Sequence, residues 1–169
     1  MTGGGANPPS NHPAGPGLSR VVIASLGNEY RRDDGAGQIV AAAAADQLPG
    51  VRHVGPQVDP LELLGRWDGA ELAVVIDATG AAGTPGAVRV VNLEERVESP
   101  GVTSTHGISL AGVLRLARAV GRAPDRVIVV GIEGEDFGKG PGLSPSVSAS
   151  VPLAVRKVVE LIEEARKCA

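Results

Sequence analysis

The chain has 169 residues, a length that suits one domain with a buried core and is short for two. Aromatic residues make up only 2% of it and the formal net charge is -3, which argues against an aromatic stacking platform for single-stranded nucleic acid and against a basic surface for a phosphate backbone. The single cysteine, Cys168, excludes an internal disulfide and a cysteine-rich zinc site, and we interpret it as a helix-end residue without a catalytic role.

The first 18 residues form a tail rich in glycine, proline and asparagine, and we predict that segment 1–18 is disordered. The tail has neither the basic start nor the apolar stretch of a secretory signal. No apolar run reaches the roughly 20 residues that span a bilayer. We therefore expect a cytoplasmic protein without membrane insertion, with one folded domain over residues 19–169. His12 lies in the tail and is expected to be solvated.

The first half of the folded region alternates predicted strands and helices. Two strands are rich in β-branched residues and almost entirely apolar, so we expect them to be buried. A third strand is weaker and carries His53, which we interpret as structural. In chain order the elements are a strand over Arg20–Leu26, a helix over Asp33–Leu48, the weaker strand over Val51–Gln57, a short helix over Pro60–Trp67 and a strand over Glu71–Asp77.

The second half continues the alternation. A more exposed strand is predicted over Gly86–Leu93, followed by a polar loop, and apolar residues at the helical period predict a helix over His106–Val120. A buried strand, Arg126–Ile132, leads into a glycine-rich loop. The last helix is predicted to open with Ser144 as its cap and Pro145 as its first residue, with a kink or a restart at Pro152.

Alternating strands and helices predict the fold class. We expect a single α/β domain, a three-layer sandwich in which a mostly parallel, twisted sheet has helices on both faces. The nearly continuous apolar strands fit burial on both sides of such a sheet. In open α/β sheets ligands bind beyond the carboxyl ends of the strands. Polar residues that follow the predicted strands are therefore the candidates for a functional site.

Polar side chains follow several of these strands. Asp33 and Asp34 come after the first strand, Asp77 ends the third and His106 stands at the start of a helix. Each also fits a structural role, because carboxylates and polar residues cap helices and loops. Together two carboxylates and an imidazole predict a divalent-metal site, for nickel, zinc, manganese or iron, with Asp33 the better candidate for helix capping. The loop after the last strand adds further carboxylates, namely Glu133, Glu135 and Asp136.

Four motifs follow one another between Val21 and the last helix. They read G-N-x-x-x-x-D-D-G-x-G, then an apolar strand ending in I-D-A, then T-H-G-x-S-L, and finally V-G-I followed by G-L-S-P-x-V. In this order they resemble the [NiFe]-hydrogenase maturation endopeptidases. The segment Q-x-x-P-L, which begins at Gln57, departs from members that carry an aspartate and glycines slightly earlier, and it resembles another branch of the family.

The resemblance implies an endopeptidase that removes the C-terminal extension of a hydrogenase large-subunit precursor after nickel insertion, with that precursor as its partner. In the family the second acid of the first motif, the carboxylate of the strand end and the later histidine form a metal-binding trio. These positions match Asp34, Asp77 and His106, which the resemblance makes both the catalytic and the metal-binding residues. The nickel is expected to be that of the precursor, and no nucleotide cofactor is implied.

The chemistry and two other functions stay open at this point. A metal ion would polarise the scissile carbonyl or activate water, whereas in an aspartic-type reaction Asp34 would be the general base. The L-G-N after the first strand also resembles peptidyl-tRNA hydrolases, whose downstream histidine has no counterpart near Asp33 and Asp34. A non-catalytic metal- or nucleotide-binding module is the other alternative, although Gly27 alone does not complete a G-x-G-x-x-G.

Overall fold

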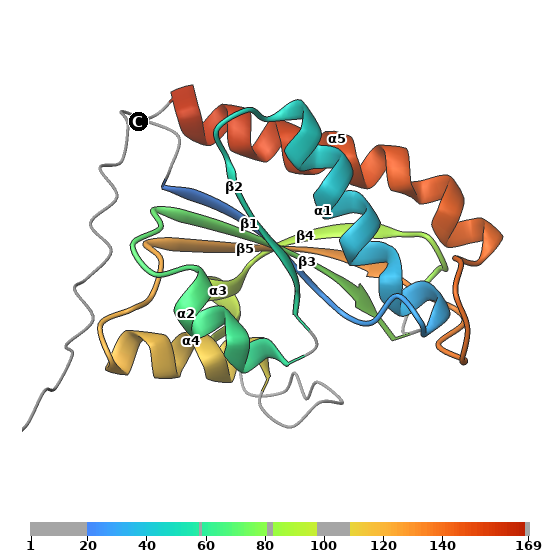
Figure 1. Ribbon diagram of the computed structural model, residues 1–169, viewed down its shortest axis with the longest axis horizontal. Coiled ribbons are helices and arrows are strands. Elements are labelled where there is room, and N and C mark those ends of the chain that lie inside the picture. The colour runs from blue at the N-terminus through green and yellow to red at the C-terminus, as the bar shows by residue number, and fades with distance from the viewer. Residues whose placement is uncertain (1–19, 58, 81–82, 98–108, 168–169) are drawn as a thin grey trace, which may run out of the picture.

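A central sheet lies between two layers of helices in the computed structural model, which describes residues 20–57, 59–80, 83–97 and 109–167 (Figure 1). This arrangement confirms the predicted three-layer α/β fold with a mostly parallel sheet. Three residues singled out from the sequence, His12, His106 and Cys168, lie outside the described ranges. Within those ranges no helix is both long enough and apolar enough to cross a membrane.

The sheet has five strands in the order β2-β1-β3-β5-β4. The pairings of β1 with β2, of β1 with β3 and of β3 with β5 are all parallel, so the carboxyl ends of these strands share one edge. Strand β4 pairs with β5 in the antiparallel sense and closes the other side of the sheet. The strands span Val21–Leu26 (β1), Arg52–Gln57 (β2), Leu72–Thr79 (β3), Val88–Asn92 (β4) and Arg126–Glu133 (β5), each close to its predicted position.

Helices α1 (Ala36–Gln47) and α5 (Pro145–Lys167) cover one face of the sheet. A short 3-10 turn, η1 (Arg32–Gly35), leads into α1. Gly37 lies where α1 meets the strand ends, and a Cβ there would come within 2.7 Å of the Ile76 carbonyl oxygen. Because only glycine allows this approach, α1 begins directly on the carboxyl ends of the strands, with η1 just beyond them.

The opposite face is covered by α2 (Leu63–Arg66) and α4 (Leu110–Ala119). A second 3-10 turn, η2 (Pro60–Glu62), precedes α2, and together they occupy the predicted short helix. A helix that sequence reasoning missed, α3 (Leu93–Val97), replaces the start of the predicted polar loop. It is only one turn long and too short for a periodic signal, although the Asn92 side chain accepts a hydrogen bond from the Glu94 N–H at 3.2 Å.

One predicted helix start is wrong, and one predicted restart is absent. Helix α4 begins at Leu110, because the Ser109 hydroxyl accepts from the Gly112 N–H at 3.1 Å and caps it there, so the predicted start at His106 is too early. Helix α5 continues through Pro152 without a restart, and the alternative, a kink at this residue, stays a prediction. Pro152 lies on the exposed face of α5, where the carbonyl that lacks a proline N–H partner can be hydrated. The predicted first residue, Pro145, is correct.

Candidate active site

The loop between β1 and η1 starts with a glycine that no other residue can replace without strain. Gly27 has φ +109, and a Cβ at this position would overlap the carbonyl oxygen of Asp34. Its N–H donates to the Gln57 carbonyl at 3.2 Å, and its own carbonyl accepts from the Gln38 side chain at 3.0 Å. The chain therefore turns sharply at the end of β1 and brings Asp34 back over the strand end.

Asp33 is fully buried and its carboxylate accepts four hydrogen bonds. The donors are the backbone N–H groups of Glu135 and Asp136, both at 2.9 Å, and the N–H and hydroxyl of Ser144 at 2.7 and 2.9 Å. Burial pushes the pKa of Asp33 upward, but the hydrogen bonds from Ser144, Asp136 and Glu135 outweigh it and hold the pKa below its ordinary value of 3.8.

The predicted helix-capping role of Asp33 is therefore wrong. Neither η1 nor α1 has a side-chain cap, and the partners of Asp33 lie 102 to 111 residues away in the chain. We call this carboxylate, together with the loop amides and the hydroxyl that bind it, the Asp33 latch. Next to it Arg32 donates its N–H to the Gly140 carbonyl at 2.9 Å, and the Gly140 N–H donates to Tyr30 at 2.8 Å. The latch thus fastens the glycine-rich loop to the segment that carries Asp34.

Asp34 is nearly buried, with 8% of its surface exposed. Its Oδ2 accepts a hydrogen bond from the Asn28 N–H at 3.0 Å, across the turn that Gly27 makes. Asn28 is also fastened to the loop, because its side-chain oxygen accepts from the Tyr30 N–H at 2.9 Å. Asp34 is therefore held at the carboxyl edge of the sheet by contacts that leave part of its carboxylate without a partner among the described residues.

Asp77 lies on β3, opposite Gly131 of β5, close to the same edge. Burial raises the pKa of Asp77 to about 7, with a further contribution from the negative charge of Asp34, while the Ala78 N–H acts in the opposite direction. Two carboxylates from separate strand ends thus lie near enough to interact. This edge holds negative charge that is poorly compensated, a condition that favours either a proton or a metal cation.

The third predicted residue of the site, His106, lies outside the described residues, and the predicted trio therefore stays a prediction. Its described neighbour Ser109 follows it by three positions and caps α4. Among the residues that the structure describes, no group of three or more histidine, cysteine, aspartate or glutamate side chains is arranged to hold a metal ion. The described part of the site is the Asp34–Asp77 pair, and two carboxylates are suitable but incomplete ligands for a divalent cation.

Two further buried polar residues lie at the same edge: Glu133, which the sequence placed among the carboxylates after the last strand, and Gln57, which was given no role in the site. Gln57 ends β2 with 3% of its surface exposed, and Glu133 ends β5 with 5% exposed. Oε1 of Gln57 and Oε2 of Glu133 have no hydrogen-bond partner among the described residues. The sequence predicted Gln57 as the last residue of a weak strand and Glu133 as the first residue after a buried one, but it did not show that either side chain is buried.

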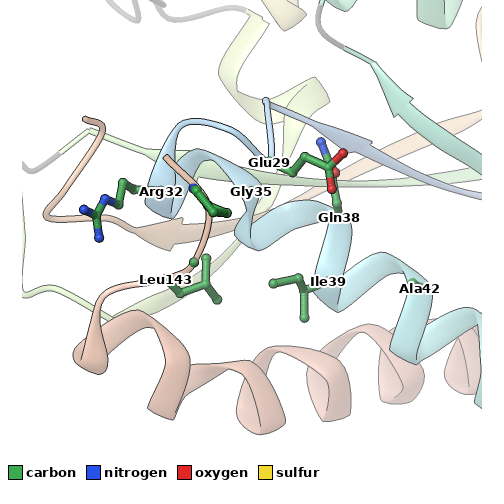
Figure 2. A pocket seen from close by; sticks show the side chains of 9 residues that line it. Glu29, Arg32, Gly35, Gln38, Ile39, Ala42 and Leu143 are labelled. Carbon is green, nitrogen blue, oxygen red and sulfur yellow. The ribbon is translucent and has the colours of Figure 1, made fainter. Parts of the chain in front are cut away.

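A pocket of about 360 Å³ lies beside η1 and is separate from the carboxylate pair, since neither Asp34 nor Asp77 lines it. Figure 2 shows Ile39 of α1 and Leu143 of the glycine-rich loop in the space between α1 and α5, with Arg32 at the far end. The other residues that line it are Glu29, Gly35, Gln38, Ala42, Pro141 and Gly142.

Comparison with known proteins gives a consistent result. A family model described as hydrogenase maturation protease matches residues 58–161. The hydrogenase 2 maturation protease of Escherichia coli (strain K12) is 26% identical over 150 residues, which are 86% of this chain and 92% of that protein.

Solved structures agree with this match. The hydrogenase maturating endopeptidase HybD from Escherichia coli is similar with a TM-score of 0.75 and 25% identity, covering 86% of this chain and 93% of that one. The [NiFe] hydrogenase maturation protease HybD from Thermococcus kodakarensis is similar with a TM-score of 0.67 and 29% identity, covering 84% and 98%. Fold and sequence therefore point to the same group of proteins.

Proposed function

Because the chain belongs to the hydrogenase maturation protease family, we propose that it is an endopeptidase that removes the C-terminal extension of a [NiFe]-hydrogenase large-subunit precursor after nickel insertion. The Asp34–Asp77 pair supports this proposal most directly, because its residues occupy the positions of the family motif and lie together at the carboxyl edge of the sheet. The match to the family favours this function over a peptidyl-tRNA hydrolase or a non-catalytic binding module.

In this proposal Asp34, Asp77 and His106 contact the nickel that the precursor already carries. The raised pKa of Asp77 suits such a task, since a proton that Asp77 holds in the free protein is released when a cation arrives. A precursor without nickel offers no cation to offset the two carboxylates. The site would then distinguish the loaded precursor from the unloaded one by charge as well as by shape.

The cleavage step has two candidate chemistries. With the metal as Lewis acid, the three residues orient the nickel-loaded end of the precursor and the ion polarises the scissile carbonyl. Without it, a carboxylate takes the proton from the attacking water, and a base is most effective when its pKa is near the working pH. A pKa of about 7 makes Asp77 the carboxylate that meets this condition. We therefore propose Asp77 as the base in the second case.

The experiment incubates the purified protein with precursor prepared with and without nickel and weighs the products by mass spectrometry. We expect a C-terminal fragment only from the loaded precursor. Asp77→Asn and His106→Ala should abolish its release. Glu71→Gln is the matched control, since Glu71 is ion-paired with Arg20 at the opposite end of β3. Unchanged cleavage in the first two variants would show that the trio is not the active site.

A further inference from the structure

Glu133 has a buried carboxylate that is only half satisfied. Its side chain is 7% exposed, and Oε1 pairs with the Arg89 Nε at 3.2 Å. Oε2 is shielded from water and has no hydrogen-bond partner among the described residues. A buried acceptor without a donor costs free energy that folding alone does not recover, so such a group points to a partner that arrives later.

The surroundings of Glu133 are built to hold this carboxylate in one place. A Cβ at Gly83 would lie 2.8 Å from an Arg89 guanidinium nitrogen and 3.3 Å from the Glu133 carboxyl carbon, so the absence of a side chain there leaves room for the ion pair. The Glu133 N–H donates to Ala87 at 2.9 Å, and its carbonyl accepts from Gly86 at 2.7 Å. Both contacts tie the end of β5 to the start of β4, its neighbour in Figure 1.

Glu133 lies on the same face of the sheet as Asp77. Val75 of β3 and Val129 of β5 pack into the core under α4, and side chains alternate along a strand, so Asp77 and Glu133 face that side too. Glu133 is opposite Thr79, two residues beyond Asp77. Glu133 is therefore at the same edge and on the same face as Asp77, displaced toward β4.

Glu133 is nevertheless distinct from the metal-binding pair. It does not join Asp34 and Asp77 in any arrangement able to hold a metal, within the residues that the structure describes. Arg89, whose side chain is 61% exposed, already balances the charge of Glu133. These observations indicate that Glu133 is a hydrogen-bond acceptor and not a further metal ligand.

Building on the proposed function, we propose that Oε2 of Glu133 accepts a hydrogen bond from the precursor segment next to the cleaved bond. The donor is a peptide N–H or a basic side chain of that segment, since both supply the missing hydrogen. The exposed Arg89 marks the side from which the segment reaches Glu133, because the ion pair extends from the buried carboxylate to the surface. Binding then recovers the desolvation cost that the free protein carries.

The test is the cleavage of nickel-loaded precursor by the wild-type protein and by Glu133→Gln. A glutamine has one acceptor oxygen, which Arg89 engages, so its NH₂ faces the incoming donor and opposes it. We expect KM to rise about tenfold with little change in kcat, as for a lost hydrogen bond to a charged group. Glu71→Gln, which also removes an ion-paired carboxylate, should leave both constants unchanged. Thermal unfolding of both variants checks that they are folded.

A KM for Glu133→Gln within about twofold of wild type overturns the proposal. The donor is identified with precursors that carry either an N-methylated peptide bond or a neutralised basic side chain near the cut. The effect of Glu133→Gln should disappear with one of them, and its persistence with every replacement also overturns the proposal. If the wild-type protein does not cleave the precursor, the proposed function fails instead. The Kd for the precursor is then measured in place of KM. Binding by Glu133→Gln that is about tenfold weaker than wild type supports the role of Glu133, and equal binding contradicts it.

Discussion

Asp33 and Asp77 are both carboxylates at the carboxyl edge of one sheet, yet the protein treats their charges in opposite ways. The carboxylate of Asp33 receives four hydrogen bonds, and its pKa lies below 3.8. Asp77 is half-buried beside another carboxylate, and its pKa rises to about 7. The same side chain is therefore stabilising in one position and poised to exchange a proton or bind a cation in the other.

The segment between β1 and α1 carries both a stabilising carboxylate, Asp33, and a carboxylate of the proposed site, Asp34. Asp33 and Asp34 are adjacent, so the latch that satisfies Asp33 also fixes where Asp34 stands relative to Asp77. A tightly bonded carboxylate thus provides a rigid support for a pair whose charges oppose each other. Substituting Asp33 and Asp77 separately distinguishes a role in stability from a role in cleavage.

The largest expected effect is the loss of cleavage in Asp77→Asn. An amide is a weak ligand and a poor base, so we expect kcat/KM for nickel-loaded precursor to fall about a thousandfold or more. The folded state should remain at least as stable as wild type at pH 8, because a partly desolvated charge near Asp34 is removed. Product mass and thermal unfolding measure the two quantities. A variant that unfolds at lower temperature would contradict the assignment of Asp77 as an unfavourable charge.

The pH dependence of stability separates the two aspartates. Because the pKa of Asp77 is raised in the folded state, its contribution is complete below pH 3.8 and is lost as the pH rises through about 7. We expect this loss to be on the order of 4 kcal/mol in the free energy of unfolding. The contribution of Asp33 has the opposite sign, since its lowered pKa gives stability above pH 3.8 that disappears in stronger acid.

Urea unfolding of wild type and Asp77→Asn between pH 4 and pH 8 tests this difference. The decline with rising pH should be present in the wild type and reduced in the variant. Parallel curves for the two proteins would show that another group is responsible.

Asp33→Asn should destabilise the protein by about 2 kcal/mol at pH 7. The amide nitrogen of asparagine would face at least one of the N–H groups that Asp33 binds, leaving a buried donor without an acceptor. The exposed Asp46 on α1 provides a control. Asp46→Asn should change the free energy of unfolding by less than about 0.5 kcal/mol. Equal effects of the two substitutions on urea unfolding would mean that the hydrogen bonds of Asp33 do not stabilise the folded state.

The smallest effect is expected at Arg32, which borders the latch. It has φ 53, a conformation that glycine adopts at lower cost, and its side chain is 3.7 Å from Asp136 in an exposed ion pair. Arg32→Gly relieves the backbone and removes a weak surface interaction, so we expect a change of less than about 1 kcal/mol. A larger loss of the free energy of unfolding, measured by urea unfolding, would show that the Arg32–Asp136 ion pair also stabilises the latch.

The sequence predicted the strands, the layers and the edge at which polar residues gather, because apolar runs and their period reflect burial directly. It also predicted that Asp34 and Asp77 lie at that edge. It misassigned Asp33, since its partners are backbone N–H groups of a distant loop and backbone donors carry no sequence signature. The unpartnered oxygens of Gln57 and Glu133 were equally invisible, because hydrogen-bond satisfaction depends on three-dimensional neighbours.

The Asp33 latch also has a consequence for the order of events during synthesis. Asp33 waits for Ser144, which leaves the ribosome 111 residues later, after all five strands have been made. Until then its carboxylate has no donors, and the segment that carries Asp34 is free to move. The edge that carries Asp34 is therefore completed only after β5 and the start of α5 have been synthesised, so a shorter nascent chain holds the Asp34 segment without the latch.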